Sequence, residues 1–122
     1  MKITILVIED NPDNLDLVTE ILEDEGYTII GAGSAEEGIK KLRECEIDLV
    51  LMDVGLPDMD GLEATRIVKS DKSLSKIPII ALTAYAMKGD KEKVLEAGCD
   101  GYLTKPLDES ILLETIESFV EG

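Results

Sequence analysis

Three acidic side chains follow apolar runs in a pattern that could hold a cation. The stretch ILVIEDN, residues 5–11, runs into Glu9 and Asp10, and the stretch DLVLMD, residues 48–53, ends at Asp53. If both runs are neighbouring strands of a parallel sheet, their carboxyl ends share one edge and the three carboxylates gather there. Close carboxylates raise one another's pKa unless a positive charge lies among them. The pattern therefore indicates a site for a metal ion.

Two more polar side chains lie at the ends of apolar runs further along the chain. Thr83 follows residues 77–82, and Lys105 lies just after residues 101–103. Either one alone is more often an ordinary surface residue, but here each ends a successive strand candidate. Lys105 would leave the group of three carboxylates with two negative charges, which one divalent cation neutralises. A set of oxygen ligands with room for water suits Mg²⁺, with Mn²⁺ as the alternative, and such an ion can also hold a phosphoryl oxygen.

The candidate site residues must be positioned by strands and helices, and the pattern of the rest of the chain predicts these elements. Buried-strand runs alternate with stretches that have helical spacing and helix-capping residues. The predicted strands are residues 3–8, 28–32, 48–52, 77–82 and 101–103. The predicted helices begin after Asn11, Ser34, Asp60, about Met87 and Asp108, and the first and fourth end at Gly26 and Gly98.

Five nearly continuously apolar strands that alternate with five helices predict an α/β fold. Strands of this composition are buried on both faces, so the sheet is expected to be parallel, with helices on both sides. No linker, repeat or low-complexity stretch interrupts the pattern. We therefore expect residues 1–122 to form a single domain.

Composition narrows the classes of function. The 122 residues carry 27 acids and 12 bases, a formal net charge of −15. This charge argues against binding to nucleic acid or to an anionic membrane, and it suits a cation or a basic protein surface. The absence of histidine excludes histidine-based catalysis and a phosphohistidine in this chain. Cys45 and Cys99 form no C-x-x-C pair, and no signal or membrane-spanning run is present, so a cytoplasmic protein is expected.

The motifs VIEDN, LMDVGLPDMDG, ALTAYA and GYLTKP, in this order and spacing, resemble the receiver domains of two-component response regulators. The resemblance covers the whole chain and implies a flavodoxin-like sheet with the strand order 2-1-3-4-5. It further implies a phosphorelay switch of the single-domain, chemotaxis-regulator type. Such a domain accepts a phosphoryl group from the phosphohistidine of a sensor histidine kinase or a phosphotransfer protein. It catalyses its own Mg²⁺-dependent phosphorylation and dephosphorylation, although it is mainly a signalling protein.

The resemblance also assigns roles to individual residues. Asp53 matches the phosphoacceptor. The metal ligands would be Glu9, Asp10, Asp53 and the backbone carbonyl of Gly55. Thr83 and Lys105 match the hydroxyl and the ammonium that contact the phosphoryl group. Tyr102 matches the aromatic residue that changes position, together with Thr83, on activation. A downstream protein or a second copy would then dock on the face formed by the fourth helix, the fifth strand and the fifth helix.

Several positions of this chain modify the family pattern. Many members have Asp where this chain has Glu9, and the longer side chain favours a water-bridged metal contact. Gly55 carries no side chain, and we expect Gly55 and Tyr85 together to set the lifetime of the phosphoryl group. The resemblance also implies a cis bond between Lys105 and Pro106.

The sequence also allows other functions to be considered for this architecture. A flavin-binding protein of this architecture needs a Ser/Thr/Gly-rich loop after the first strand, where this chain has EDNPD. A phosphatase that forms an aspartyl phosphate needs an acid two residues after its nucleophile, where this chain has Gly55. The domain could also be a docking module that works without phosphorylation, or a receiver cut from a hybrid kinase. Met1 directly before the first strand favours a free-standing regulator over the latter.

Overall fold

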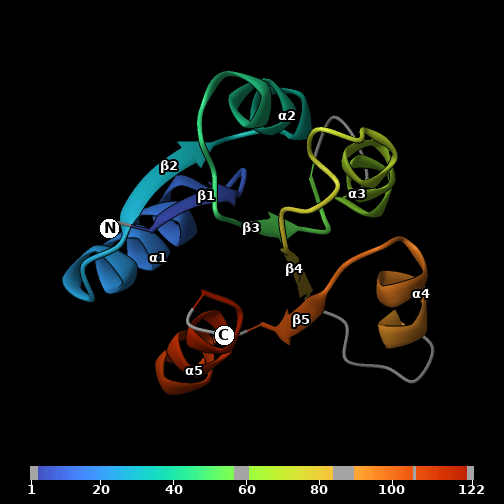
Figure 1. Cartoon of the computed structure of the whole chain (residues 1–122). Coiled ribbons are helices and arrows are strands. Elements are labelled where there is room, and N and C mark those ends of the chain that lie inside the picture. The colour runs from blue at the N-terminus through green and yellow to red at the C-terminus, as the bar shows by residue number, and fades with distance from the viewer. Residues whose placement is uncertain (1–2, 57–60, 84–89, 106, 121–122) are drawn as a thin grey trace.

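A single five-stranded parallel sheet forms the centre of the molecule (Figure 1). The computed structural model describes residues 3–56, 61–83, 90–105 and 107–120. Within them the strand order is β2-β1-β3-β4-β5, which confirms the predicted flavodoxin-like topology. The strands are β1 (Thr4–Ile8), β2 (Thr28–Ala32), β3 (Leu49–Asp53), β4 (Ile79–Thr83) and β5 (Gly101–Thr104).

Five helices cover the two faces of this sheet. Figure 1 shows α1 and α5 on one face and α2, α3 and α4 on the other. Their bounds are α1 (Pro12–Asp24), α2 (Ala35–Glu44), α3 (Gly61–Ser70), α4 (Asp90–Glu96) and α5 (Glu109–Val120). The α/β class and the five helices agree with the sequence prediction.

The strands are continuously apolar because each of their faces is covered. In β3, Val50 and Met52 pack in the cluster beneath α2, α3 and α4, whereas Leu49 and Leu51 pack in the cluster beneath α1 and α5. All four side chains are fully buried. Each contributes about 1.5–3 kcal/mol through removal of its apolar surface from water, so the sheet is a rigid platform for its edge residues.

Helix ends follow the predicted capping chemistry. The side chain of Asn11 accepts hydrogen bonds from the amides of Asp13 and Asn14, at 2.9 and 3.2 Å, and Pro12 occupies the first turn. This cap turns the chain sharply after β1 and leaves residues 9 and 10 at the sheet edge. At the far end of α1, Gly26 adopts a φ of 93°, a left-handed conformation that favours glycine.

The central strands extend slightly beyond their predicted ends. β3 includes Asp53, and β4 includes Thr83, both of which the sequence placed just after their strands. The reason is parallel pairing, because Asp53 lies in register with Leu82 and Thr83 with Thr104. The predicted cap at Asp60 and the predicted helix start near Met87 lie outside the described residues.

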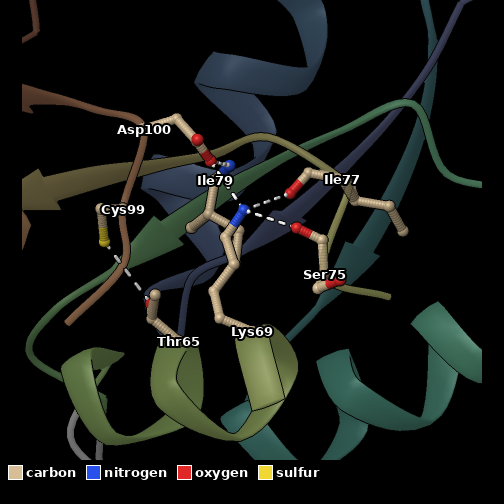
Figure 2. Close-up of polar contacts among 7 residues, drawn as sticks. All are labelled: Thr65, Lys69, Ser75, Ile77, Ile79, Cys99 and Asp100. Carbon is tan, nitrogen blue, oxygen red and sulfur yellow. Dashed lines mark hydrogen bonds and ion pairs between the residues drawn. The ribbon is translucent and has the colours of Figure 1, made fainter. Parts of the chain in front are cut away.

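A lysine on α3 ties together segments at the opposite end of the sheet. Figure 2 shows Lys69 Nζ donating to the carbonyl oxygens of Ser75 and Ile77, at 3.2 and 2.9 Å. The same ammonium lies 2.8 Å from Asp100 Oδ2, which also accepts the amide of Ile79 at 2.9 Å. We call these contacts the Lys69 clamp. It fixes the entries to β4 and β5 relative to α3.

Candidate functional site

The three carboxylates predicted from the sequence come together at the carboxyl edge of the sheet. Glu9 and Asp10 follow β1, and Asp53 ends the adjacent strand β3. Their nearest carboxylate oxygens all lie within 4.8 Å of one another. Glu9 and Asp53 are buried, whereas Asp10 is exposed. The cluster thus has an inner wall and one side that opens to solvent.

Lys105 supplies the positive charge of the site. Its Nζ lies 3.1 Å from Asp53 Oδ2 and 3.3 Å from Glu9 Oε1. The backbone amide of Lys105 donates to the carbonyl oxygen of Thr83 at 2.8 Å, so β4 fixes where this lysine leaves the sheet. The ammonium therefore bridges two carboxylates, one that follows β1 and one that ends β3.

Burial and polar contacts shift the pKa values of the two buried acids, Glu9 and Asp53, in opposite directions. Burial, and then the neighbouring Asp53 carboxylate, raise the pKa of Glu9 from 4.5 to about 7. Burial also acts to raise the pKa of Asp53. Interactions with the Glu9 carboxyl, the Gly55 amide and Lys105 outweigh it and lower the pKa of Asp53 below its ordinary value. Asp53 is therefore the ionised member of the pair.

The donor set fits a metal ion. All three acidic groups offer oxygen, which hard divalent cations prefer. Glu9 Oε2 is buried and, within the described part of the chain, has no hydrogen-bond partner. A bare carboxylate oxygen of this kind is costly unless a positive charge or donor reaches it. The acidic cluster of Glu9, Asp10 and Asp53 can thus bind a metal ion.

Gly55, Thr83 and Tyr102 are the remaining predicted site residues within the described part of the chain. The amide of Gly55 donates to Asp53 Oδ1 at 3.0 Å, so Gly55 directly adjoins the carboxylate. Thr83 is buried at the end of β4, beside β3. Tyr102 lies on β5, in register with Ala81, and is half-buried. Tyr85 and the Lys105–Pro106 bond lie outside the described residues.

A hollow beside the site was not predicted from the sequence. It has a volume of about 420 Å³ and extends from Glu9 and Lys105 toward α1. Its lining residues are Val7, Glu9, Asn14, Leu17, Val18, Leu82, Lys105 and Leu107. The Leu17 side chain is 57% exposed. The helical spacing of α1 alone did not indicate that this leucine lines a hollow. The cluster of charges is therefore flanked by an apolar surface.

Comparison with known proteins decides the family. Residues 5–117 match the family described as the response regulator receiver domain. The chain belongs to this family. A match over nearly the whole chain agrees with the motifs, the strand order and the acidic cluster, and the flavin-binding and phosphatase readings are not favoured.

Curated relatives and solved structures resemble this receiver domain over nearly its whole length. It is 41% identical to the polar-differentiation response regulator DivK of Brucella ovis, over 98% of each chain. It resembles the chemotaxis protein CheY4 of Vibrio cholerae with a TM-score of 0.93 and 26% identity, covering 98% of this chain and all of the other. The receiver domain of the sensor histidine kinase PA1611 of Pseudomonas aeruginosa has a TM-score of 0.92 and 33% identity, with full coverage of both chains. That structure has a magnesium ion coordinated in its active site cleft.

Membership in the family gives this receiver domain its place in two-component signal transduction. As a receiver domain of a response regulator it interacts with histidine kinases or phosphotransfer proteins. Among the described residues, none of the helices has the length and apolar character needed to cross a membrane.

Proposed function

We propose that Asp53 accepts a phosphoryl group from a phosphohistidine, in a reaction that requires Mg²⁺ bound by Glu9, Asp10, Asp53 and the carbonyl of Gly55. The observation that supports this proposal most is the position of the Asp53 carboxylate between a positive ammonium group and two other carboxylates. Lys105 Nζ lies 3.1 Å from one of its oxygens, and the carboxylates of Glu9 and Asp10 lie beside it. The magnesium ion in the receiver domain of PA1611 supports the choice of metal.

In the proposed reaction, a carboxylate oxygen of Asp53 forms a bond to phosphorus as the phosphorus–nitrogen bond of the donor breaks. The electron pair of that bond stays on the imidazole nitrogen of the donor histidine. The product is an acyl phosphate, a covalent intermediate known for aspartate nucleophiles. Lys105 is placed to neutralise part of its added negative charge. When bound, the metal would neutralise further charge on the phosphoryl oxygens.

Labelling with a small phosphodonor tests this proposal. We expect the intact mass of the protein to rise by one phosphoryl group in acetyl phosphate and Mg²⁺, and not in EDTA. Asp53→Asn should abolish the label because the nucleophile is removed. Asp24→Asn, at the exposed far end of α1, is the matched control and should label normally. Labelling of Asp53→Asn, or equal labelling in EDTA, contradicts the proposal and favours a docking module that needs no phosphorylation.

The lifetime of the phosphoryl group would depend on what shields it from water. Within the described residues, a Cβ added at Gly55 would meet only Asp53 Oδ1, at 3.8 Å, so these residues leave this flank of the carboxylate open. Tyr85, two residues after Thr83, would shield the other flank with its ring. We therefore assign the larger influence on hydrolysis to Tyr85.

The proposed output is a switch on the face formed by α4, β5 and α5. The phosphoryl group would attract the Thr83 hydroxyl, and the Tyr102 ring would turn into the space behind β4. Register supports this path, because Tyr102 lies beside Ala81, a small residue two positions before Thr83. Tyr102 also lines a hollow of about 360 Å³ with Leu107, Ile111 and Thr115, among others. A downstream protein or a second copy would dock on this face, and the domain would act in the cytoplasm.

A further inference from the structure

Gly61, the first residue of α3, lies directly on the backbone of the phosphoacceptor candidate. A Cβ added at Gly61 would lie 2.5 Å from the carbonyl oxygen of Asp53 and 2.8 Å from Cα of Val54. Both atoms belong to the backbone at the end of the central strand β3, which cannot turn aside as a flexible side chain can. The contact therefore requires glycine for its small size and not for an unusual φ, since Gly61 is not among the residues with positive φ.

The amide of Gly61 reaches the reacting carboxylate through one peptide group. Gly61 N–H donates to the carbonyl oxygen of Val54 at 3.1 Å. That carbonyl belongs to the same planar peptide as the amide of Gly55, which donates to Asp53 Oδ1 at 3.0 Å. Holding one end of a planar peptide orients the other, and hydrogen bonds in series strengthen one another.

The preceding peptide, between Asp53 and Val54, is tied to the sheet. Val54 N–H donates to the carbonyl oxygen of Leu82 at 3.0 Å, so β4 fixes the start of the loop while Gly61 fixes its carbonyl. We propose that Gly61 is a positioning residue for phosphoryl transfer, which orients the Asp53 carboxylate through the Val54–Gly55 peptide. This inference rests on the proposed role of Asp53.

The first turn of α3 is itself anchored, which makes Gly61 a fixed support. Thr65 is fully buried and its Oγ1 donates to the carbonyl oxygen of Gly61 at 2.8 Å. Figure 2 shows the sulfur of Cys99 in contact with the same hydroxyl, at 3.5 Å. One turn further along α3, the Lys69 clamp holds the helix to Asp100. Sliding of α3 away from Asp53 would break the contacts of Thr65 with Cys99 and of Lys69 with Asp100, while the bond from Thr65 to Gly61 keeps the first turn of the helix intact.

Gly61→Ala tests the inference, with Gly33→Ala as the matched control because a Cβ there meets nothing within 4 Å. In Gly61→Ala we expect the Gly55 amide proton to move upfield as its hydrogen bond to the carboxylate weakens. Labelling by acetyl phosphate should slow by about tenfold or more, since small misplacements of reacting groups cost rate steeply. Gly33→Ala should change neither quantity. Ile116→Val, a core change on the buried side of α5, should lower stability yet leave the Gly55 amide in place.

A folded Gly61→Ala that keeps the Gly55 amide shift and the wild-type labelling rate overturns the inference. Two measurements decide the question if Gly61→Ala does not fold. The wild-type protein should show a scalar coupling across the hydrogen bond between Gly61 nitrogen and Val54 carbonyl carbon. Thr65→Val should slow labelling by about fivefold, the equivalent of one hydrogen bond, and Thr65→Ser should restore it. Absence of the coupling, or no loss in Thr65→Val, contradicts the positioning role.

These readouts separate the inference from the proposed function. If acetyl phosphate does not phosphorylate the wild-type protein, the proposed role of Asp53 as the phosphoacceptor is wrong. The amide shift and the scalar coupling still report whether Gly61 orients the carboxylate, because both are measured in the unmodified protein.

Discussion

Glu9 and Asp10 are adjacent in the chain, yet their carboxylates lie in different surroundings. Glu9 is 3% exposed, whereas Asp10 faces solvent. Glu9 Oε1 accepts a hydrogen bond from Lys105, and Oε2 has no partner within the described residues. The charge of Glu9 is therefore costly in the metal-free protein, and Glu9 is the acid that a bound cation relieves most.

This burial predicts a pH dependence of the stability of the metal-free protein. Glu9 keeps its proton in the folded state up to about pH 7, whereas the unfolded chain loses it near 4.5. Because the folded state binds more protons in this window, the free energy of unfolding should fall as pH rises from about 4.5 to 7. Glu9→Gln should remove this fall. Urea unfolding in EDTA across the window measures it, and an equal slope in Glu9→Gln would exclude Glu9 as the cause.

Asp10 allows the metal site to be tested through stability. Metal at a hundred times its Kd should add about 2.7 kcal/mol to the free energy of unfolding, because only the folded state holds the assembled cluster. Asp10→Asn should lose most of this gain while raising the stability of the metal-free protein, since repulsion is reduced. The control is Asp24→Asn, which makes the same charge change far from the cluster. An equal rise in melting temperature with Mg²⁺ in wild type and Asp10→Asn would place the metal elsewhere.

At the scale of elements, α3 joins the reactive end of the sheet to its opposite end. It begins on the backbone of Asp53 at Gly61 and carries Lys69 toward the entries of β4 and β5. The Lys69 side chain is only 19% exposed, and it satisfies two carbonyl oxygens of the connection that leads into β4. We infer that α3 sets the relative position of β3, β4 and β5.

The Lys69 clamp should therefore contribute to the stability of the fold. Lys69→Met removes the ammonium from two carbonyl oxygens and Asp100, and we expect a loss of about 1–3 kcal/mol in the free energy of unfolding. Lys40→Met is the control, because its ion pair with Glu44 spans 3.9 Å on an exposed helix face. Such a pair contributes about 0–1 kcal/mol. Urea unfolding of both variants compares them, and similar losses would show that the clamp adds nothing.

The sequence predicted the elements well and the contacts between them only in part. Strand alternation and capping residues such as Asn11 predicted a parallel sheet with helices on both faces, and the resemblance to receiver domains predicted its strand order. This topology brings Glu9, Asp10 and Asp53 to one edge. The Lys69 clamp could not be predicted, because a lysine in an amphipathic helix usually points to solvent. The contact of Gly61 with Asp53 was missed for a related reason. The local pattern accounts for Gly61 as an ordinary helix-start residue, and the contact depends on tertiary packing.

At the scale of the whole molecule, the central claim is that a phosphoryl group at Asp53 is sensed at β5 and α5. Asp53 is in register with Leu82 on β4, and Thr83 is in register with Thr104 on β5. Under the proposed switch, a change at Asp53 would pass through β4 to β5, the strand that carries Tyr102. A shift of a two-state equilibrium from 1:99 to 99:1 needs about 5.5 kcal/mol, which new contacts of a metal-bound phosphoryl group with Thr83 and Lys105 can supply in good part.

Amide NMR with beryllofluoride, which mimics the phosphoryl group, tests this claim most directly. In the presence of Mg²⁺ we expect amide shifts near Asp53 and also at Thr83, at Tyr102 and along α5. Thr83→Ala should still bind beryllofluoride but transmit less of the change to Tyr102, because the hydroxyl that links the two positions is gone. Shifts confined to the loops around Asp53, with β5 and α5 unchanged in the wild-type protein, would contradict the switch.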